Sequence, residues 1–276
     1  MFTRHLHAYY LFPRKDKVGK IIAVANQKGG VGKTTTAINL SASLAKLGKK
    51  ALAVDMDPQG NMTSGLGVNK HNLPASVYEM MLGEQSFYNT VHHDVYPGLD
   101  LIPSSVDLAA IEIELTTEPN KEFVLQEIIR PMAGLYDFII IDCPPSLNLL
   151  TLNALTTADS VLVPIQCEYY ALEGLSQLIH TITLVKQRLN PALSIDGIVF
   201  TMYDARTNLS RQVVQNVCEN LAQHIYRTVI GRGVRLAEAP SYGMPICEYD
   251  PSSNGAAQYM QLAQEVIDRT EQELWQ

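Results

Sequence analysis

A glycine-rich loop between an apolar run and a helical pattern restricts the folds open to this chain more than any other feature. The run Ile21–Val24 is typical of a buried parallel strand, and an amphipathic pattern extends over residues 34 to about 47. The loop between them contains Gly29, Gly30 and Gly32. Because glycine lets the backbone wrap closely, successive N–H groups of such a loop can point into one concavity. We therefore expect the strand, loop and helix to form an anion-binding unit.

The loop differs from the common phosphate-binding pattern G-x-x-x-x-G-K-[ST] at its start. Gln27 stands where the first glycine would be, and a second lysine, Lys28, follows it, which gives the variant form K-G-G-x-G-K-[ST]. Lys33 is placed to reach the β- and γ-phosphates of a nucleotide, and the hydroxyl of Thr34 is placed to ligate Mg²⁺. The N-terminus of the following helix adds partial positive charge at the same point. The motif predicts binding of a nucleoside triphosphate with Mg²⁺.

Apolar runs and helical patterns alternate along the chain. Strands are predicted at 21–24, 50–55, 99–103, 136–142, 160–165, 195–202 and 226–230, and helices at 34–47, 75–82, 105–115, 121–129, 147–156, 173–188, 209–224 and 256–274. This alternation predicts an α/β fold, a doubly wound, mostly parallel sheet of the P-loop NTPase type with helices on both faces. The segment His92-His93-Asp94 is expected to be a surface loop and not a metal site, because no further ligands stand at useful spacing.

Length and composition suit one P-loop ATPase domain over residues 20–276, since 276 residues with 46% hydrophobic content can build one sizeable core. Residues 1–19 are aromatic and basic but lack signal-peptide features. We interpret them as an N-terminal extension that is either disordered or the product of a start assigned too early, with Val18 as the alternative start. The four cysteines form no C-x-x-C pair, which favours the reducing cytoplasm, and no apolar run reaches the ~18 residues of a membrane span.

Three carboxylates, Asp55, Asp57 and Asp142, stand at the ends of predicted strands. Ligands of open α/β sheets bind at the carboxyl ends of the strands, so these side chains are expected beside the loop. Asp142 closes a run of isoleucines, a position suited to holding Mg²⁺ directly or through water, and Asp57 is suited to orienting an attacking water. Phosphoryl transfer requires alignment and positive charge on the γ-phosphate oxygens, which Lys28, Lys33 and Mg²⁺ would supply.

These features resemble the ParA/MinD family of deviant Walker ATPases, and especially its chromosomal ParA (Soj) branch. The similarity extends from about Lys20 to the final helix. It rests on N-Q-K-G-G-V-G-K-T-T-T (26–36), D-M-D-P-Q-G-N (55–61), I-I-I-D-C-P-P-S-L (139–147), P-I-Q-C-E-Y-Y-A-L-E-G (164–174), T-M-Y-D-A-R-T-N-L (201–209) and R-L-A-E-A-P-S-Y-G (235–243). The resemblance implies a weak Mg²⁺-dependent ATPase that acts as a nucleotide switch in chromosome or plasmid partitioning.

The resemblance also implies roles for individual residues. Lys28 would reach across an ATP-sandwich homodimer to the neighbouring nucleotide, and Asp57 would position the hydrolytic water, so these two would be the catalytic residues. Thr34, Asp57 and Asp142 would surround Mg²⁺. The residues expected to contact ATP are Lys28, Gly29, Gly30, Val31, Gly32, Lys33, Thr34, Thr35, Met202 and Pro240, with Pro240 and its neighbours beside the adenine.

Arg206 and Arg235 match positions where this branch places arginines that contact DNA. The chain as a whole carries a net charge of −7, but the stretch from residue 186 to residue 235 is basic. Its acids are Asp196, Asp204 and Glu219, and its cations are Lys186, Arg188, Arg206, Arg211, Arg227, Arg232 and Arg235. Such a patch suits contacts to the phosphate backbone, and a dimer doubles it. The implied partners are a second copy of the chain, non-specific DNA and a ParB-type centromere-binding protein, in the cytoplasm at the nucleoid.

Four other functions fit parts of the sequence. A MinD-like membrane ATPase in division-site placement would end in a basic amphipathic helix, whereas residues 265–276 are acidic, so no membrane partner is expected. An iron–sulphur ATPase of the nitrogenase-reductase type needs cluster-loop sequences that the chain lacks. A nicotinamide-dependent oxidoreductase needs G-x-G-x-x-G, but position 35 is threonine. A DNA-binding regulator stays open in the sense that turnover would be very slow, but no helix-turn-helix segment precedes residue 20, so operator reading by that route is not expected.

Overall fold

One mostly parallel sheet runs through the molecule. The computed structural model describes residues 19–168, 171–221 and 224–273, so residues 1–18, with the alternative start at Val18, lie outside the described residues. The sheet has eight strands in the order β3-β4-β2-β5-β1-β6-β7-β8. The strands are β1 (Lys20–Val24), β2 (Ala51–Asp55), β3 (His92–Tyr96), β4 (Leu99–Ile102), β5 (Phe138–Asp142), β6 (Ser160–Gln166), β7 (Ser194–Tyr203) and β8 (Ile225–Gly231).

Neighbouring strands are parallel throughout the sheet, except that β3 pairs antiparallel with β4 at one edge. The chain builds the sheet outward from β1 in both directions, first to β2 and later to β6, β7 and β8. The carboxyl end of β1 therefore lies at the point where the strand order reverses, which is where open α/β sheets bind ligands. The predicted doubly wound, mostly parallel fold is confirmed.

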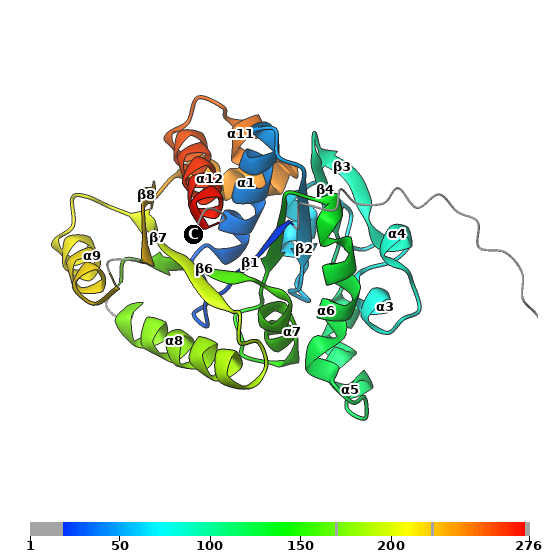
Figure 1. Ribbon diagram of the computed structural model, residues 1–276. Coiled ribbons are helices and arrows are strands. Elements are labelled where there is room, and N and C mark those ends of the chain that lie inside the picture. Colours follow the sequence, from blue (N-terminus) through cyan, green and yellow to red (C-terminus); the bar gives the residue numbers. More distant parts are fainter. Residues whose placement is uncertain (1–18, 169–170, 222–223, 274–276) are drawn as a thin grey trace, which may run out of the picture.

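Helices cover both faces of this sheet (Figure 1). The α-helices are α1 (Lys33–Lys46), α2 (Asn61–Gly65), α3 (Val77–Met81), α4 (Phe87–Thr90), α5 (Ile111–Glu114), α6 (Val124–Ile129), α7 (Leu149–Thr157), α8 (Ala171–Arg188), α9 (Asn208–Leu221), α10 (Val234–Glu238), α11 (Ile246–Tyr249) and α12 (Asn254–Glu273). Short 3₁₀ turns accompany them at η1 (Val106–Ala110), η2 (Lys121–Phe123), η3 (Arg130–Leu135) and η5 (Ala239–Tyr242).

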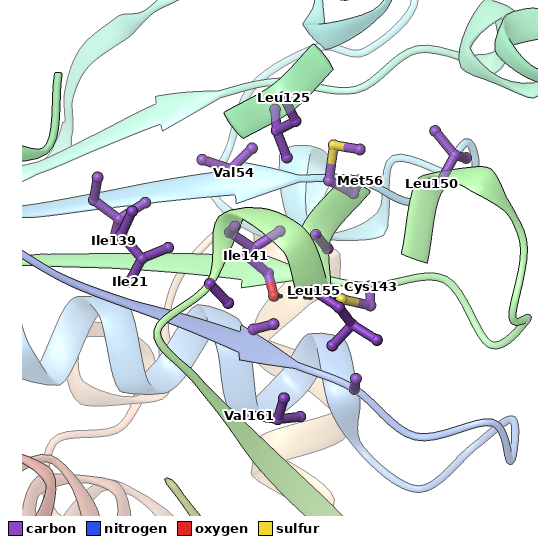
Figure 2. Packing of buried hydrophobic residues seen from close by; sticks show 14 of the residues in the cluster. Ile21, Val54, Met56, Leu125, Ile139, Ile141, Cys143, Leu150, Leu155 and Val161 are labelled. Carbon is purple, nitrogen blue, oxygen red and sulfur yellow. Dashed lines mark hydrogen bonds between the residues drawn. The ribbon is translucent and has the colours of Figure 1, made fainter. Parts of the chain in front are cut away.

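Strand alternation divides the buried side chains of β5 between two cores. Ile139 and Ile141 belong to the cluster that includes Leu125 of α6 and Leu150 and Leu155 of α7, and Figure 2 shows these residues together. Successive side chains of a strand point to opposite faces, so their neighbours must face the other way. Because both faces are covered, the run is apolar at every position and shows no alternation in the sequence.

The other face of β5 packs against α1, which in turn packs against α12. Phe138 and Ile140 belong to this second cluster, together with apolar side chains of both helices. By the same alternation, Asp142 is turned to the side where α1 begins. A strand that the sequence reads as uniformly apolar thus delivers its final carboxylate to the start of the helix that follows the glycine-rich loop.

The structure corrects one prediction and adds several short elements. The segment His92-His93-Asp94 is not a loop but the start of β3, whose half-exposed residues pair with β4. Asp100 stabilises this edge, because its carboxylate lies 2.9 Å from Nδ1 of His93 and accepts a hydrogen bond from the backbone N–H of Asp94. Single-turn elements such as α4, α10 and α11 are too short to leave a helical period in the sequence.

Candidate nucleotide-binding site

The glycine-rich loop adopts a backbone that most residues could not follow. Gly30 has φ of 75° and Gly32 has φ of 86°, both in the left-handed region that glycine enters without steric cost. Gly32 is also the residue from which α1 starts, and among the described residues no side chain caps this helix and no acid lies in its first turn. The first N–H groups of α1 are therefore free to bind an anion.

Two neighbouring strands hold the loop in place. The side chain of Asn26 donates from Nδ2 to the carbonyl of Pro164 in β6 at 2.7 Å and accepts from the N–H of Lys28 at 3.0 Å. The hydroxyl of Thr201 in β7 donates to the carbonyl of Val31 at 2.8 Å. These contacts fix both halves of the loop to the sheet, so the cradle exists before any ligand binds.

The two lysines of the loop take opposite directions. Lys33 is buried and its ammonium donates to the carbonyl of Lys28 at 3.0 Å. Burial lowers the pKa of Lys33, and Asp142 is the main group that opposes this shift. The ammonium of Lys28 instead forms an ion pair with Glu168 at 2.7 Å, and Gln166 donates to the other oxygen of that carboxylate. Lys33 thus serves its own loop, whereas Lys28 contacts the segment after β6.

The strand register brings the acids to one level. Asp142 lies opposite Val24 in β1 and opposite Asp55 in β2. Asp55 is fully occupied, because it accepts from the N–H and hydroxyl of Thr63 at 2.8 and 2.7 Å and from the N–H of Asp57 at 3.1 Å. Burial raises the pKa of Asp55 to about 6 despite these bonds. Asp55 therefore fixes the turn that carries Asp57 and the start of α2.

Asp142 is the residue of the site whose carboxylate lacks hydrogen-bond partners in the described part of the chain. Its side chain is fully buried, and neither carboxylate oxygen has a hydrogen-bond partner among the described residues. Burial, and then the charge of Asp55, raises its pKa well above the usual range, while the nearby Thr34 hydroxyl and Lys33 act in the opposite direction. Buried polar atoms in folded proteins are normally satisfied, so these oxygens point to a missing ligand.

The donor set fits Mg²⁺ held jointly by the protein and a phosphate. Mg²⁺ usually binds one or two protein carboxylates and keeps water or substrate phosphate as its other ligands. Asp142 offers two free oxygens, Thr34 offers a hydroxyl, and Asp57 lies nearby with Oδ1 accepting from the N–H of Gln59 at 2.9 Å. Within the described part of the chain, no three His, Cys, Asp or Glu residues form a metal cage of their own.

A cleft of about 400 Å³ opens in front of the loop. The predicted residues that line it are Gly29, Gly30, Gly32, Lys33, Thr34, Thr35, Asp57 and Met202. Val31 is buried behind the loop, and Lys28 and Asp142 are not part of the lining. Sequence reasoning assigned no role to Gln59, Asn61 and Pro145, which also line the cleft, although all three belong to segments singled out by the resemblance.

A smaller, more apolar cavity of about 170 Å³ adjoins the cleft, and the two share Gly32, Thr35 and Met202. Met202 has φ of 50°, a left-handed backbone at the end of β7. Leu236 and Ala237 of α10 line this cavity, one turn before the position predicted to lie beside adenine. Pro240 itself lies in η5, close to Gly65 of α2 and outside the lining of both cavities.

The two arginines assigned to DNA follow β7 and β8, Arg206 in the loop after β7 and Arg235 in α10. The side chain of Arg206 is 89% exposed and binds Asp204 through two hydrogen bonds of 2.9 and 2.7 Å. These bonds lower the pKa of Asp204 to about 2, and the charge of Arg232 adds to the effect. Arg235 is 60% exposed and donates to Glu238 at 3.0 Å. Arg206 and Arg232, from the segments after β7 and β8, thus both act on Asp204, and Arg232 and Arg235 line one cavity.

Comparison with known proteins gives a consistent result. A family model described as an AAA domain matches residues 19–195. The chain is 52% identical over 252 residues to the chromosome partitioning protein ParA of Myxococcus xanthus, covering 91% of this chain and 89% of that protein. It is 53% identical over 249 residues to the sporulation initiation inhibitor protein Soj of Bacillus subtilis, covering 90% and 98%.

A solved structure extends the similarity to a liganded protein. Cobyrinic acid a,c-diamide synthase from Mycobacterium smegmatis, solved with a bound ATP analog and magnesium, is 38% identical with a TM-score of 0.76. The match covers 90% of this chain and 93% of the synthase. Separately, none of the helices in the described ranges is long and apolar enough to cross a membrane.

Proposed function

The chain belongs to the ParA/MinD family of P-loop ATPases, and we propose that it is an ATP-dependent switch acting in chromosome or plasmid partitioning. One observation carries the proposal more than any other: the loop holds two lysines that face in different directions. Lys33 is committed to its own cleft, whereas Lys28 lies outside it on an ion pair with Glu168. A residue placed in this way is suited to the nucleotide of a second subunit.

The cleft would hold ATP with its phosphates against the loop. The free N–H groups at the start of α1 and the ammonium of Lys33 would bind the phosphate oxygens, and the apolar cavity lined by Leu236 and Ala237 would accept the base. Thr34 and Asp142 would hold Mg²⁺, with Asp57 beside them. Mg²⁺ held there would supply positive charge to the phosphate oxygens as negative charge develops on them.

The switch follows from a change of partner at Lys28. In the single subunit, Lys28 neutralises Glu168, a contact in which both side chains remain partly exposed. Partly exposed ion pairs contribute little stability, so this contact can be given up for a triphosphate at low cost. When two subunits close around ATP, each Lys28 would move to the neighbour's γ-phosphate, and Asp57 would orient the attacking water. Hydrolysis would remove the charge that Lys28 binds and open the dimer.

DNA binding would depend on the dimer because each arginine contributes weakly. Arg206 and Arg235 are exposed and already paired with acids of their own chain. Doubling the patch lets weak contacts act together, so the ATP dimer would bind DNA non-specifically and place the protein on the nucleoid in the cytoplasm. Slow hydrolysis in the absence of a partner suits this role, and a ParB-type centromere-binding protein would accelerate it.

The C-terminal helix supports a role away from the membrane. Glu273 of α12 pairs with Lys20 at the start of β1, and Glu271 pairs with Lys49 at 3.3 Å. These contacts tie the end of α12 to β1 and to the loop before β2, and the charged residues of α12 that are exposed, Asp268, Glu271 and Glu273, are all acids. Anionic lipid would repel such a helix, in contrast to the basic amphipathic helix of a membrane-surface protein.

The proposal is tested by measuring DNA binding and subunit state under the same three conditions. Fluorescence anisotropy with duplex DNA of unrelated sequences, and size-exclusion chromatography in parallel, are run with ATP, with ADP and without nucleotide. We expect a dimer and DNA binding only with ATP and Mg²⁺, equal for all sequences. Equal DNA binding in all three states, or an ATP-bound monomer that retains DNA, would contradict the proposal.

A further inference from the structure

Lys70, in the loop that follows α2, contacts the turn that carries Asp57. Its ammonium donates a hydrogen bond to the backbone carbonyl of Gln59, and no acid of the described residues forms an ion pair with it. The chain has 28 acids against 21 lysines and arginines, so this lysine binds a carbonyl although carboxylates are abundant. The bond therefore directs attention to the shape of the turn.

The bond from Lys70 holds one end of a peptide unit whose other end holds Asp57. The unit between Gln59 and Gly60 presents its carbonyl to the lysine, and its N–H donates to the carbonyl of Asp57 at 2.8 Å. The preceding N–H, that of Gln59, donates to Oδ1 of Asp57 at 2.9 Å. Because a peptide unit is planar and rigid, fixing its carbonyl also fixes its N–H. Both bonds to Asp57 thus depend on a backbone that Lys70 holds.

The side-chain stem of Lys70 also packs on the turn. Gly60 has φ of 57°, in the left-handed region, and is buried. A Cβ at this position would lie 2.9 Å from Cδ of Lys70 and 3.2 Å from the carbonyl oxygen of Ser104. Lys70 and Ser104 therefore approach the backbone of Gly60 so closely that only glycine leaves room for them.

The loop that carries Lys70 is anchored to α2. Two residues before the lysine, the N–H of Val68 donates to the carbonyl of Thr63 at 3.1 Å. The N–H and hydroxyl of Thr63 are in turn bound to the buried carboxylate of Asp55. The lysine thus reaches back from a loop that is fixed to the end of β2, and its bond to the turn closes a ring over α2.

We propose that Lys70 is a positioning residue for hydrolysis, which keeps the carboxylate of Asp57 aimed at the attacking water. The inference rests on the proposed function, in which Asp57 orients that water. Gln59 and Asn61, on either side of Gly60, line the nucleotide cleft, whereas Lys70 does not, so it acts through the turn. A misplacement of about 1 Å can lower a rate about a hundredfold, so one bond to this turn can control turnover without binding the nucleotide.

The test compares Lys70→Met, which keeps an unbranched stem but removes the ammonium, with Lys70→Arg, which keeps the charge and the donors. Phosphate release by the full chain is measured with Mg²⁺–ATP. We expect kcat of Lys70→Met to fall about tenfold or more, with KM and ATP-dependent dimerisation within about twofold, and Lys70→Arg to retain most of the turnover. The matched control is Lys46→Met, because the ammonium of Lys46 donates to the carbonyl of Cys247 at 3.0 Å, outside the cleft.

Combination with Asp57→Ala shows whether Lys70 acts through Asp57. Lys70→Met should not lower the residual turnover of Asp57→Ala further, because residues that act as a unit are not additive. A second loss of similar size on that background, a rise in KM with unchanged kcat, or an equal loss in Lys46→Met would overturn the proposal. Full activity of Lys70→Met beside inactive Asp57→Ala would overturn this inference alone, whereas full activity of Asp57→Ala would also remove the role that the proposed function gives Asp57.

Hydrogen exchange of the nucleotide-free chain adds a readout that is independent of turnover. Lys70→Met should speed exchange at the amides of Gln59 and Gly60, because their bonds to Asp57 are no longer held from the carbonyl side. Lys46→Met should leave these amides unchanged. Equal exchange at Gln59 and Gly60 in Lys70→Met and the unmodified chain would mean that the lysine does not hold the turn, and the proposal would fail.

Discussion

The nucleotide cleft and the arginine surface, formed by Arg206, Arg232 and Arg235, place their charges in opposite environments. In the cleft, Lys33 is only 7% exposed and Asp142 is fully buried. On the arginine surface, Arg206 and Arg235 are 89% and 60% exposed and bind acids of the same chain. The charged groups of the cleft are not fully paired within the part of the protein that the structure describes, whereas the arginines are already paired with acids.

This difference separates nucleotide binding physically from the proposed DNA binding. Buried charges interact in a low dielectric and are little screened, so one subunit is enough to bind a nucleotide. Exposed charges are screened by salt and contribute little one at a time, so the arginine surface gains strength only by number. We therefore infer that the switch changes how many arginines contact DNA at the same time and does not alter the individual arginines.

The largest effect is expected in the cleft, from Asp57→Ala. Loss of the residue that orients the attacking water should lower turnover by about 10²–10⁴-fold while ATP binding and dimerisation survive. The arginine surface should then stay on DNA, because the dimer no longer opens. Phosphate release and size-exclusion chromatography with ATP measure both effects, with Asp268→Ala, an exposed acid on α12 outside the cleft, as a comparison. A monomeric Asp57→Ala in ATP would remove the role assigned to this residue.

The opposite pattern, in which DNA binding is lost and dimerisation is kept, is expected from Arg206→Glu combined with Arg235→Glu. DNA affinity should fall by about a hundredfold or more, since two phosphate contacts become repulsive, while ATP-dependent dimerisation stays intact. Lys50→Glu, which changes an exposed lysine outside the arginine surface, should have little effect. DNA retention by the double variant would show that other residues carry the contact.

Salt should distinguish the two regions without any mutation. The logarithm of the DNA affinity should fall by about 0.9 for each logarithmic unit of salt and each phosphate contact, whereas dimerisation on ATP should change less. The slope for the double arginine variant should be smaller than that of the unmodified chain. Anisotropy titrations over a range of salt concentrations measure both slopes, and a flat response of DNA binding would argue against a phosphate-contacting surface.

Buried charge in the cleft should lower the free energy of unfolding, whereas the exposed charges of the arginine surface should not. A stability measurement tests this difference. Asp142→Asn should raise the free energy of unfolding of the nucleotide-free chain by about 1–3 kcal/mol at pH 8, because it removes a buried carboxylate without partners. The pKa of Asp142 is raised by folding, so the native state keeps its proton when the unfolded state has lost it. Stability should therefore fall as pH rises above about 4, and the variant should lose part of this dependence.

Urea unfolding with and without Mg²⁺–ATP measures this effect. The unmodified chain should gain stability from the nucleotide, and Asp142→Asn should gain much less. Arg206→Glu, in which an exposed cation is replaced, should leave the nucleotide-free stability nearly unchanged. An Asp142→Asn variant that is less stable than the unmodified chain at pH 8 would mean that the carboxylate has partners in solution.

Much of the cleft could be predicted from the sequence because its parts are local. The glycines, Lys33 and Thr34 are adjacent in the chain, and a uniformly apolar strand ends at Asp142. Strand–loop–helix order then fixes where these residues lie, since parallel strands end at one edge. The mostly parallel sheet and the helices on both of its faces follow from the alternation of elements, whereas the order of the strands does not.

The remaining features depend on contacts between distant residues. The ion pair of Lys28 with Glu168 joins two loops that only the pairing of β1 with β6 brings together. Leu236 reaches the apolar cavity through a helix too short to leave a period, and β3 is an edge strand whose half-exposed residues have no clear alternation. Such features require the assembled sheet and could not be read from local pattern.

The central claim, that Lys28 serves the nucleotide of a neighbouring subunit, is tested most directly by mixing two inactive variants. Lys28→Ala keeps Asp57 but cannot supply the lysine, and Asp57→Ala keeps the lysine but cannot hydrolyse. In a mixed dimer, the site of the Lys28→Ala subunit would receive Lys28 from the other chain. We expect each variant alone to release almost no phosphate and mixing to restore turnover. Continued inactivity after mixing, with mixed dimers demonstrated, or full activity of Lys28→Ala alone, would contradict it.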